Sequence, residues 1–186
     1  MKINGLTLKK IVQFKGHEGE PCFQGDLYLG STKIAEWSQD SHGAVYDNLR
    51  METGYSEEKL RDAIISNNEP VKYNYAGESW EDGYSIEELA WDLIVLKDCE
   101  KSYKKAIKDG YAGYVEVRGH VWTQAFAVTK TMLERSDADL AKLLSFEAHT
   151  AFEKGEATIH RFTSTDDFNV GKAIKLADIR ADVMKI

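Results

Sequence analysis

Hydrophobic and polar positions alternate over the first fifty residues, and short glycine-containing segments separate the runs. Apolar residues fall within 6–14, 23–29 and 34–37, with turn-forming residues at 16–19 and 30–31. A period of two between turn signals predicts β-strands, and the short connection Gly30-Ser31 predicts a tight hairpin with positive φ at the glycine. We therefore expect an N-terminal three-stranded antiparallel meander, followed by a polar loop over 39–49.

The hydrophobic period then changes to that of a helix. Ser56 precedes an acidic helix start and predicts a short helix over 57–65. Ser85 and Glu88 have the spacing of a capping box, and the helical spacing continues to a natural stop at Gly110. The apolar positions at helical spacing in this long central helix are Ile86, Leu89, Leu93, Leu96, Tyr103 and Ile107. In the first half, the apolar face is widened by Trp91, Ile94 and Val95, which predicts that this half is buried on two sides.

The C-terminal part of the chain mixes both patterns. Strand-like runs at 114–118 and 121–128 flank Gly119-His120 and predict a hairpin, and 157–162 alternates like a further strand. Between them, Ser136 opens a helix that is expected to continue to Gly155. The tail, 172–186, fits a helix better than a strand.

These elements predict an α+β fold: an N-terminal antiparallel β-meander, a long central helix, and a second small antiparallel sheet packed by helices. We expect a β-meander module over 1–50 and an α+β module over 51–186, together forming one compact unit. No Gly/Ser linker or internal repeat separates independent modules.

Composition narrows the function classes. The chain has 186 residues, a mass of 21.0 kDa, a net charge of −7 and an isoelectric point near 5.3, which disfavours ordinary nucleic-acid binding and predicts no direct sequence-specific DNA contact. The two cysteines, Cys22 and Cys99, form no CxxC pair and are expected to be reduced thiols. Without a signal-like or membrane-length apolar run, we expect a soluble cytoplasmic protein with no membrane partner.

The negative charge is concentrated in the middle of the chain. Residues 51–110 hold 14 acidic and 8 basic side chains, and no Lys or Arg occurs between Tyr73 and Leu96. After Leu96 the sign reverses, with five lysines on the same predicted helix. The residues that we expect to contact a partner lie in the first of these segments: Glu78, Trp80, Glu81, Asp82, Tyr84, Glu87, Glu88 and Asp92.

Two interpretations of this charge pattern stay open. Acids at a helix start and lysines at its end both complement the helix dipole, by about 0.3–1 kcal/mol each. The acids at 78–82, however, precede the helix, so the dipole does not require them. Aromatic residues among exposed acids are typical of a surface that binds a basic partner.

An enzymatic alternative is a small ribonuclease-like hydrolase. Alternation on the strand at 114–120 places Glu116, Arg118 and His120 on one face, where they could serve as general base, phosphate clamp and general acid. Ion pairing across a solvated strand face explains the same spacing equally well.

Metal and cofactor chemistry finds little support. His149 and Glu153 are four residues apart on a predicted helix, with His160 further along, but a surface His–Glu pair explains this spacing better than a metal site. Cys99 lies beside the apolar stripe near Glu100 and is expected to be a core residue with an ordinary or raised pKa. We expect no cofactor, and no glycine-rich phosphate loop is present.

The opening segment MKINGLTLKK (1–10) and the segment GDLYLGSTKI (25–34) resemble proteins carried by mobile elements of Gram-positive bacteria, and the size and acidity are similar to those of streptococcal type II anti-CRISPR proteins. This resemblance implies inhibition of an RNA-guided, Cas9-type nuclease, by occupying a nucleic-acid-binding surface or, in some members, by causing the guide RNA to be shortened. It supplies no catalytic residue.

The acidic segment and the resemblance agree, because a Cas9-type nuclease with its guide RNA is a large basic partner. We therefore expect an inhibitor that binds through the acidic segment, more in the manner of a binding protein than of an enzyme. The alternatives are the hydrolase that uses Glu116, Arg118 and His120, and a non-enzymatic structural or regulatory protein of a mobile element.

Overall fold

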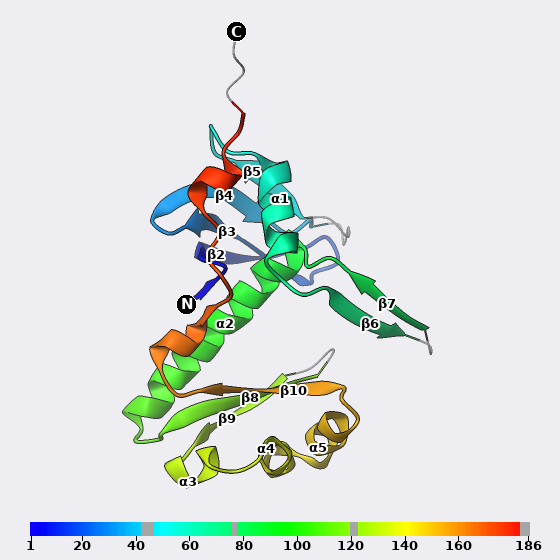
Figure 1. The fold of residues 1–186 in the computed structure, drawn as a ribbon, viewed down its shortest axis with the longest axis vertical. Coiled ribbons are helices and arrows are strands. Elements are labelled where there is room, and N and C mark those ends of the chain that lie inside the picture. The colour runs from blue at the N-terminus through cyan, green and yellow to red at the C-terminus, as the bar shows by residue number, and fades with distance from the viewer. Residues whose placement is uncertain (42–46, 76–77, 120–122, 183–186) are drawn as a thin grey trace. The chain divides into compact units, whose positions relative to one another are not determined.

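The computed structural model describes residues 1–41, 47–75, 78–119 and 123–182 (Figure 1). It confirms the α+β class and divides the chain into two compact units. Unit 1 comprises Met1–Val95 together with Asn169–Ile186, and unit 2 comprises Leu96–Phe168. The division falls within the long helix, whereas the sequence pattern suggested modules over 1–50 and 51–186.

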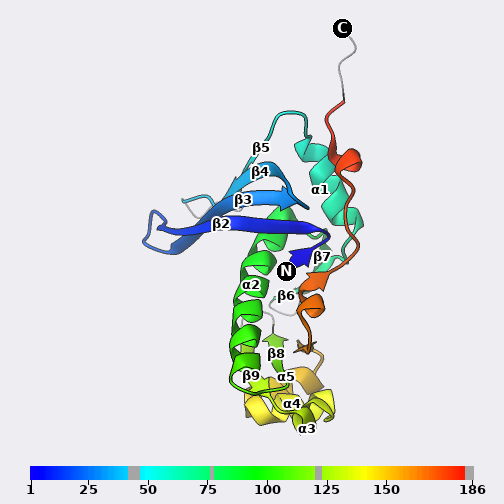
Figure 2. The ribbon, with the colours of Figure 1, turned by 90° about the vertical axis from the view of Figure 1, so that its left-hand side faces the viewer.

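A six-stranded sheet with the order β11-β1-β2-β3-β4-β5 forms the body of unit 1 (Figure 2). The predicted meander is its centre: β2 (Leu6–Lys15), β3 (Pro21–Leu29) and β4 (Thr32–Ser38) pair antiparallel in sequence order. Gly30 has a φ of 63°, as the hairpin requires. The outer strands are β1 (Lys2–Ile3), β5 (Asn48–Met51) and β11 (Asn169–Val170), of which β11 is parallel to β1.

The meander has a β-bulge in its first strand. The register between β2 and β3 shifts between Lys9 and Val12, and Lys10 has a φ of 50°. Opposite the bulge, a Cβ on Gly25 would come within 2.9 Å of the Lys9 carbonyl oxygen. Glycine in this strand therefore allows the close backbone approach that the bulge creates.

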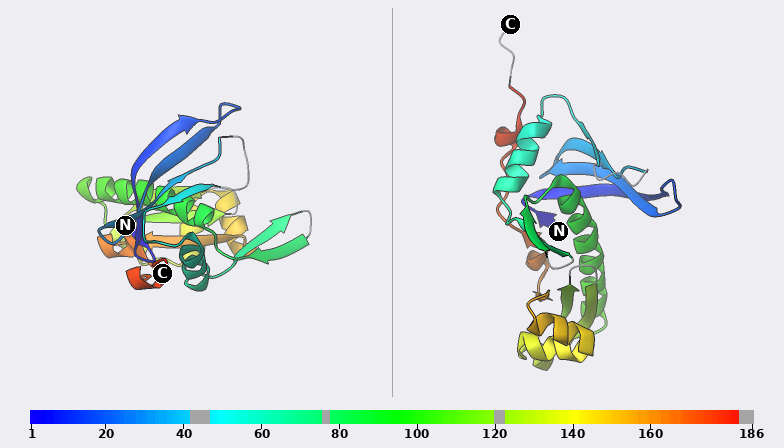
Figure 3. Two further views of the ribbon diagram at one scale, coloured as in Figure 1. Left: turned by 90° about the horizontal axis from the view of Figure 1, so that it is seen from above. Right: turned by 90° about the vertical axis from the view of Figure 1, so that its right-hand side faces the viewer.

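Helices and the C-terminal tail complete the core of unit 1. The helix α1 (Glu57–Ser66) starts at Ser56, whose hydroxyl accepts a hydrogen bond from the Lys59 amide at 3.3 Å, as predicted. It buries Leu60 and Ile64. A two-stranded ribbon, β6 (Val71–Tyr75) and β7 (Glu78–Asp82), follows it and pairs with no other strand of the described chain. Figure 3 shows this ribbon extending away from the six-stranded sheet.

The helix α2 (Ile86–Lys108) begins in unit 1 and ends in unit 2. Ser85 and Glu88 form the predicted capping box: the Glu88 carboxylate accepts from the Ser85 amide at 2.6 Å, and the Ser85 hydroxyl accepts from the Glu88 amide at 3.2 Å. The prediction of burial in the first half was wrong at Trp91, which is 50% exposed, and at the end of the apolar stripe Ile107 is 41% exposed.

Unit 2 is a three-stranded sheet with helices on both faces (Figure 1). The predicted hairpin of β8 (Gly113–Gly119) and β9 (Thr123–Val128) is present, and β10 (Ala157–Phe162) pairs with the other edge of β8. Val115 and Val117 point to the face that is covered by α3 (Lys130–Leu133), α4 (Asp137–Leu144) and α5 (Phe146–Glu153). The C-terminal half of α2 lies on the other face, where the Cys99 thiol donates to the Glu116 carboxylate. The short helix η1 (Thr165–Phe168) closes the unit.

The structure corrects the boundaries of two expected elements. The predicted loop over 39–49 ends earlier, because Asn48 already belongs to β5. The single helix expected from Ser136 to Gly155 is interrupted at Ser145, which is extended and accepts a hydrogen bond from the Ala148 amide at 3.1 Å. Serine competes for backbone hydrogen bonds in this way and starts a new helix.

The tail is not the expected helix. Its described part contains only one short 3-10 turn, η2 (Leu176–Ile179). Buried Ile174 and Ile179 and a hydrogen bond from the Ile174 amide to the Asn4 carbonyl at 2.9 Å hold it against unit 1. Contacts with the rest of unit 1, rather than helical hydrogen bonds, thus hold this segment in place.

Candidate partner-binding surface

The residues expected to contact a partner lie on two adjoining elements of unit 1. We call them the acidic surface: Glu78, Trp80, Glu81 and Asp82 on β7, Tyr84 in the connection, and Glu87, Glu88 and Asp92 in the first two turns of α2. The side chain of Glu78 lies outside the part of the chain that the structure describes. The other seven can be placed.

Four of the carboxylates have partners within unit 1. Glu81 lies 3.3 Å from the Lys72 ammonium, and Glu87 lies 3.4 Å from the Arg61 guanidinium. Glu88 closes the capping box, and Asp92 accepts a hydrogen bond from the Tyr84 hydroxyl at 2.6 Å. The carboxylates of α2 therefore have structural roles at the helix start, which the sequence pattern did not separate from binding roles.

The freely accessible carboxylates are on the ribbon. Glu81 and Asp82 are exposed, whereas Glu87, Glu88 and Asp92 are half-buried. The Lys72–Glu81 pair is itself solvent-exposed, with 75% and 56% of the two side chains accessible, so it contributes little to stability and can be exchanged for another cation.

Two tryptophans supply exposed aromatic area beside these acids. Trp80 is 45% exposed on β7, and Trp91 is 50% exposed on α2. Trp91 is fixed from one side by Phe23, with ring centroids 6.0 Å apart in an edge-to-face arrangement. Tyr84, by contrast, is half-buried and hydrogen-bonded to Asp92. Sequence reasoning chose Tyr84 as the second anchor and assigned Trp91 to the core.

The register of the ribbon groups its residues further. Tyr73 opposes Trp80, Tyr75 opposes Glu78 and Val71 opposes Asp82, while Lys72 opposes Glu81. Directly opposed positions share a face of an antiparallel pair, and successive pairs alternate. Trp80 and Asp82 therefore share one face of the ribbon, and the Lys72–Glu81 ion pair lies on the other.

The hydrolase alternative requires an accessible general base, and the structure buries the residue proposed for that role, Glu116. Glu116 is 1% exposed, and each carboxylate oxygen has a partner: one accepts from the Cys99 thiol at 2.9 Å and the other from Arg118 Nε at 2.6 Å. A substrate hydroxyl has no access to this group. His120 lies outside the described residues. The side chain opposite Glu116 on β10 is that of His160, which contacts the Thr158 hydroxyl at 3.0 Å.

The buried carboxylate also determines the state of Cys99. Burial and the adjacent Glu116 raise the pKa of the Cys99 thiol to about 12, so the thiolate is scarcely populated near neutral pH. Cys99 is thus a core thiol, as expected, and Cys22 is also buried and unpaired.

The proposed His–Glu pair is present on α5, with His149 Nδ1 3.3 Å from Glu153. His160 does not join it. Within the described residues, no group of three or more His, Cys, Asp or Glu side chains is placed to hold a metal ion.

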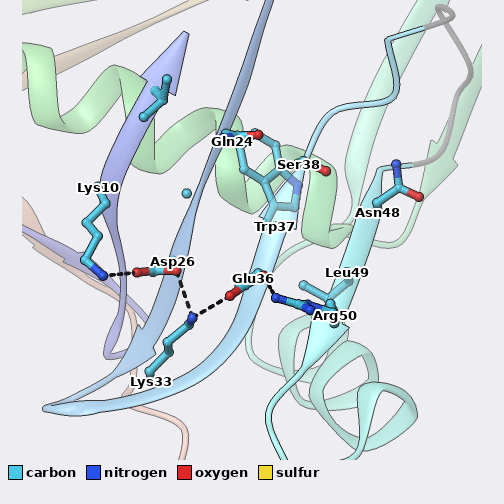
Figure 4. Close-up of a pocket in the computed structure, with 12 residues that line it drawn as sticks. Lys10, Gln24, Asp26, Lys33, Glu36, Trp37, Ser38, Asn48, Leu49 and Arg50 are labelled. Atoms are coloured by element: carbon cyan, nitrogen blue, oxygen red, sulfur yellow. Dashed lines mark hydrogen bonds and ion pairs between the residues drawn. The ribbon is translucent and has the colours of Figure 1, made fainter. Parts of the chain in front are cut away.

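Sequence reasoning missed a hollow of about 740 Å³ on one face of the six-stranded sheet (Figure 4). An ion-pair network crosses it: Asp26 accepts from Lys10 at 2.9 Å and from Lys33 at 3.0 Å, and Glu36 pairs with Lys33 at 2.7 Å and with Arg50. Lys33 also lies 3.1 Å from Glu52.

The network satisfies its own charges. Hydrogen bonds from Lys10 and Lys33 lower the pKa of Asp26, those from Lys33 and Arg50 lower the pKa of Glu36, and its three carboxylate partners raise the pKa of Lys33. Three cations and three carboxylates balance, so the network adds no net charge to the hollow. No sequence signal reveals it, because its members are brought together only by strand register.

No helix of the described chain is long and apolar enough to cross a membrane. Comparisons with protein-family models, with curated proteins and with solved structures found no match to this chain.

Proposed function

We propose that this chain is a binding protein that inhibits a basic, nucleic-acid-handling enzyme, specifically an RNA-guided nuclease of the Cas9 type, by occupying its nucleic-acid-binding surface. The observation that carries the proposal is the pairing of two half-exposed tryptophans, Trp80 and Trp91, with exposed carboxylates in a segment without Lys or Arg. Large aromatic rings anchor protein interfaces, and carboxylates attract a basic partner and set its orientation.

The ribbon supports this function physically. An isolated two-stranded hairpin is marginally stable in water, and β6–β7 has no further strand partner in the described chain. A partner that covers its aromatic and acidic face would supply the missing burial. The contact residues of the proposal are therefore Trp80 and Asp82 first, with Glu81 adding its charge from the opposite face of the ribbon and Trp91 as the second anchor.

The test is direct binding between the full chain and a purified Cas9-type nuclease loaded with guide RNA, measured at low and high salt. The double variant Glu81→Lys/Asp82→Lys is expected to lose binding and inhibition at least tenfold. The matched control is Glu147→Lys/Glu156→Lys, which makes the same change in net charge at exposed positions of unit 2 and is expected to bind as the unmodified chain does.

Trp80→Ala and Trp91→Ala separate the aromatic contribution from the charge. Each is expected to raise the dissociation constant about tenfold or more, as for hot-spot residues, with little change in salt dependence. Equal binding by the acidic double variant and its control would contradict the proposal. Guide RNA length should be unchanged during inhibition, because occupation of the surface requires no cleavage.

A further inference from the structure

The C-terminal half of α2 has a surface of opposite sign, which lies entirely in unit 2. We call it the lysine stripe: Lys97, Lys101, Lys104, Lys105 and Lys108, all exposed. Lys97, Lys101, Lys104 and Lys108 follow one another at spacings of four, three and four residues, which places their side chains on one helix face. Eleven residues at 1.5 Å each extend over about 16 Å.

These lysines are mostly without partners in the protein. Lys104 lies 2.9 Å from Glu100, but Lys97, Lys101, Lys105 and Lys108 form no ion pair with any residue that the structure describes. Residues 97–108 carry five lysines and two carboxylates, Asp98 and Glu100. The half-helix is therefore locally cationic in a chain whose net charge is −7.

The helix dipole accounts for only part of the stripe. Its effect is confined to the last turn, which contains Lys105 and Lys108. Lys97 and Lys101 lie about two turns or more before the helix end and gain nothing from the terminus. A row of cations that the fold uses only in part indicates a ligand with repeated negative charge.

The residue types favour phosphates over a protein surface. Lysine is depleted at protein–protein interfaces, whereas it serves as a point charge in contacts to nucleic-acid phosphates. Three residues after Lys108, Tyr111 is 44% exposed. A row of cations beside an exposed aromatic ring is the arrangement by which proteins hold a single strand, with phosphates on the cations and a base on the ring.

We propose that the lysine stripe, with Tyr111, binds the phosphate backbone of single-stranded nucleic acid without sequence preference. The acidic residues elsewhere do not prevent this, because exposed charges more than about 8 Å away are screened at physiological ionic strength. The site shares no residue with the acidic surface, and the proposal departs from the expectation that the overall charge disfavours contact with nucleic acid.

The test measures the fluorescence anisotropy of a labelled oligouridylate of twelve nucleotides with the full chain, from 50 to 300 mM salt. With about four phosphates neutralised, the logarithm of the affinity should fall with the logarithm of salt concentration with a slope of about −3. The variant Lys97→Gln/Lys101→Gln/Lys108→Gln should bind at least tenfold more weakly at 50 mM salt, with a slope less steep by about 2.

The matched control is Lys130→Gln/Lys142→Gln/Lys154→Gln, which removes the same charge from exposed positions of the same unit and should bind within twofold of the unmodified chain. Tyr111→Ala should weaken binding about fivefold or more while leaving the salt slope unchanged. Circular dichroism of each variant verifies the fold.

The proposal is overturned by no binding at 50 mM salt, or by equal losses in the stripe variant and its control. Equal affinity for a duplex of the same length, with no effect of Tyr111→Ala, would contradict the single-strand assignment. Binding to vesicles of anionic phosphatidylglycerol is measured for comparison. If the chain bound the vesicles through the lysine stripe but did not bind oligouridylate, the ligand would be a lipid surface and the proposal would be wrong. None of these results depends on a nuclease.

Discussion

The acidic surface, on β7 and the start of α2, and the lysine stripe, on the C-terminal half of α2, use their charges differently. Among the described carboxylates of the acidic surface, Glu81, Glu87, Glu88 and Asp92 each bond to a neighbour in unit 1. In the lysine stripe, only Lys104 has an ion-pair partner among the described residues. The number of charges in a segment therefore does not reveal how many are available to a ligand.

The carboxylate Glu116 is the extreme case of a charge that the fold uses, and its loss should have the largest effect. Glu116→Ala leaves Arg118 and the Cys99 thiol without their shared acceptor, and should lower the free energy of unfolding by about 3 kcal/mol. Chemical denaturation measures this. Glu156→Ala, at an exposed position of the same unit, should change stability by less than about 0.5 kcal/mol; equal effects would show that Glu116 is not structural.

The raised pKa of Cys99 should make the stability of the same buried cluster depend on pH. Its pKa is about 12 in the folded chain and close to 8.5 when unfolded, so the unfolded state releases the thiol proton first as pH rises. The stability contributed by the neutral thiol is complete below the unfolded pKa and falls by up to about 1.4 kcal/mol per pH unit between the two values. Denaturation curves from pH 8 to 11 should show a flatter decline for Cys99→Ala; an identical decline would contradict the assignment.

The capping box tests the structural role of the acids at the start of α2. Ser85→Ala removes the acceptor for the Glu88 amide and should lower the free energy of unfolding by about 1 kcal/mol. Asp82→Ala, in the exposed ribbon just before the helix, serves as the control and should change it by less than about 0.5 kcal/mol. If both variants were equally stable by thermal unfolding, the helix start would not depend on the cap.

The smallest effect is expected where the charges have no partner. Lys97→Gln and Lys101→Gln should each leave the free energy of unfolding unchanged within about 0.5 kcal/mol, because neither lysine pairs with a described residue or lies in the last turn. Lys108→Gln should cost slightly more, since it loses the favourable interaction with the helix dipole. A marked loss at Lys97 would mean that the stripe stabilises the fold.

Local chemistry in the sequence predicted much of the fold. The positive φ of Gly30, the capping box of Ser85 and Glu88, and the strand Ala157–Phe162 all appear in the structure. These features depend on residues within a few positions of one another, so neighbouring side chains are enough to specify them. Ser145 is likewise a local signal, because it caps the start of α5. The apolar stripe on either side of it led the sequence analysis to expect one continuous helix instead.

For the candidate sites, the sequence by itself determined which charges and rings occur together: the acids and Trp80 before α2, the lysines after Leu96, and Glu116 beside Arg118 in strand alternation. Only the tertiary structure decided which of them face solvent. It buried Glu116 against Cys99, exposed Trp91 beside Phe23, and assembled the Asp26 network from strands distant in sequence. The physical reason is that exposure and pairing depend on which elements pack together, and residue spacing along one element carries no record of its neighbours.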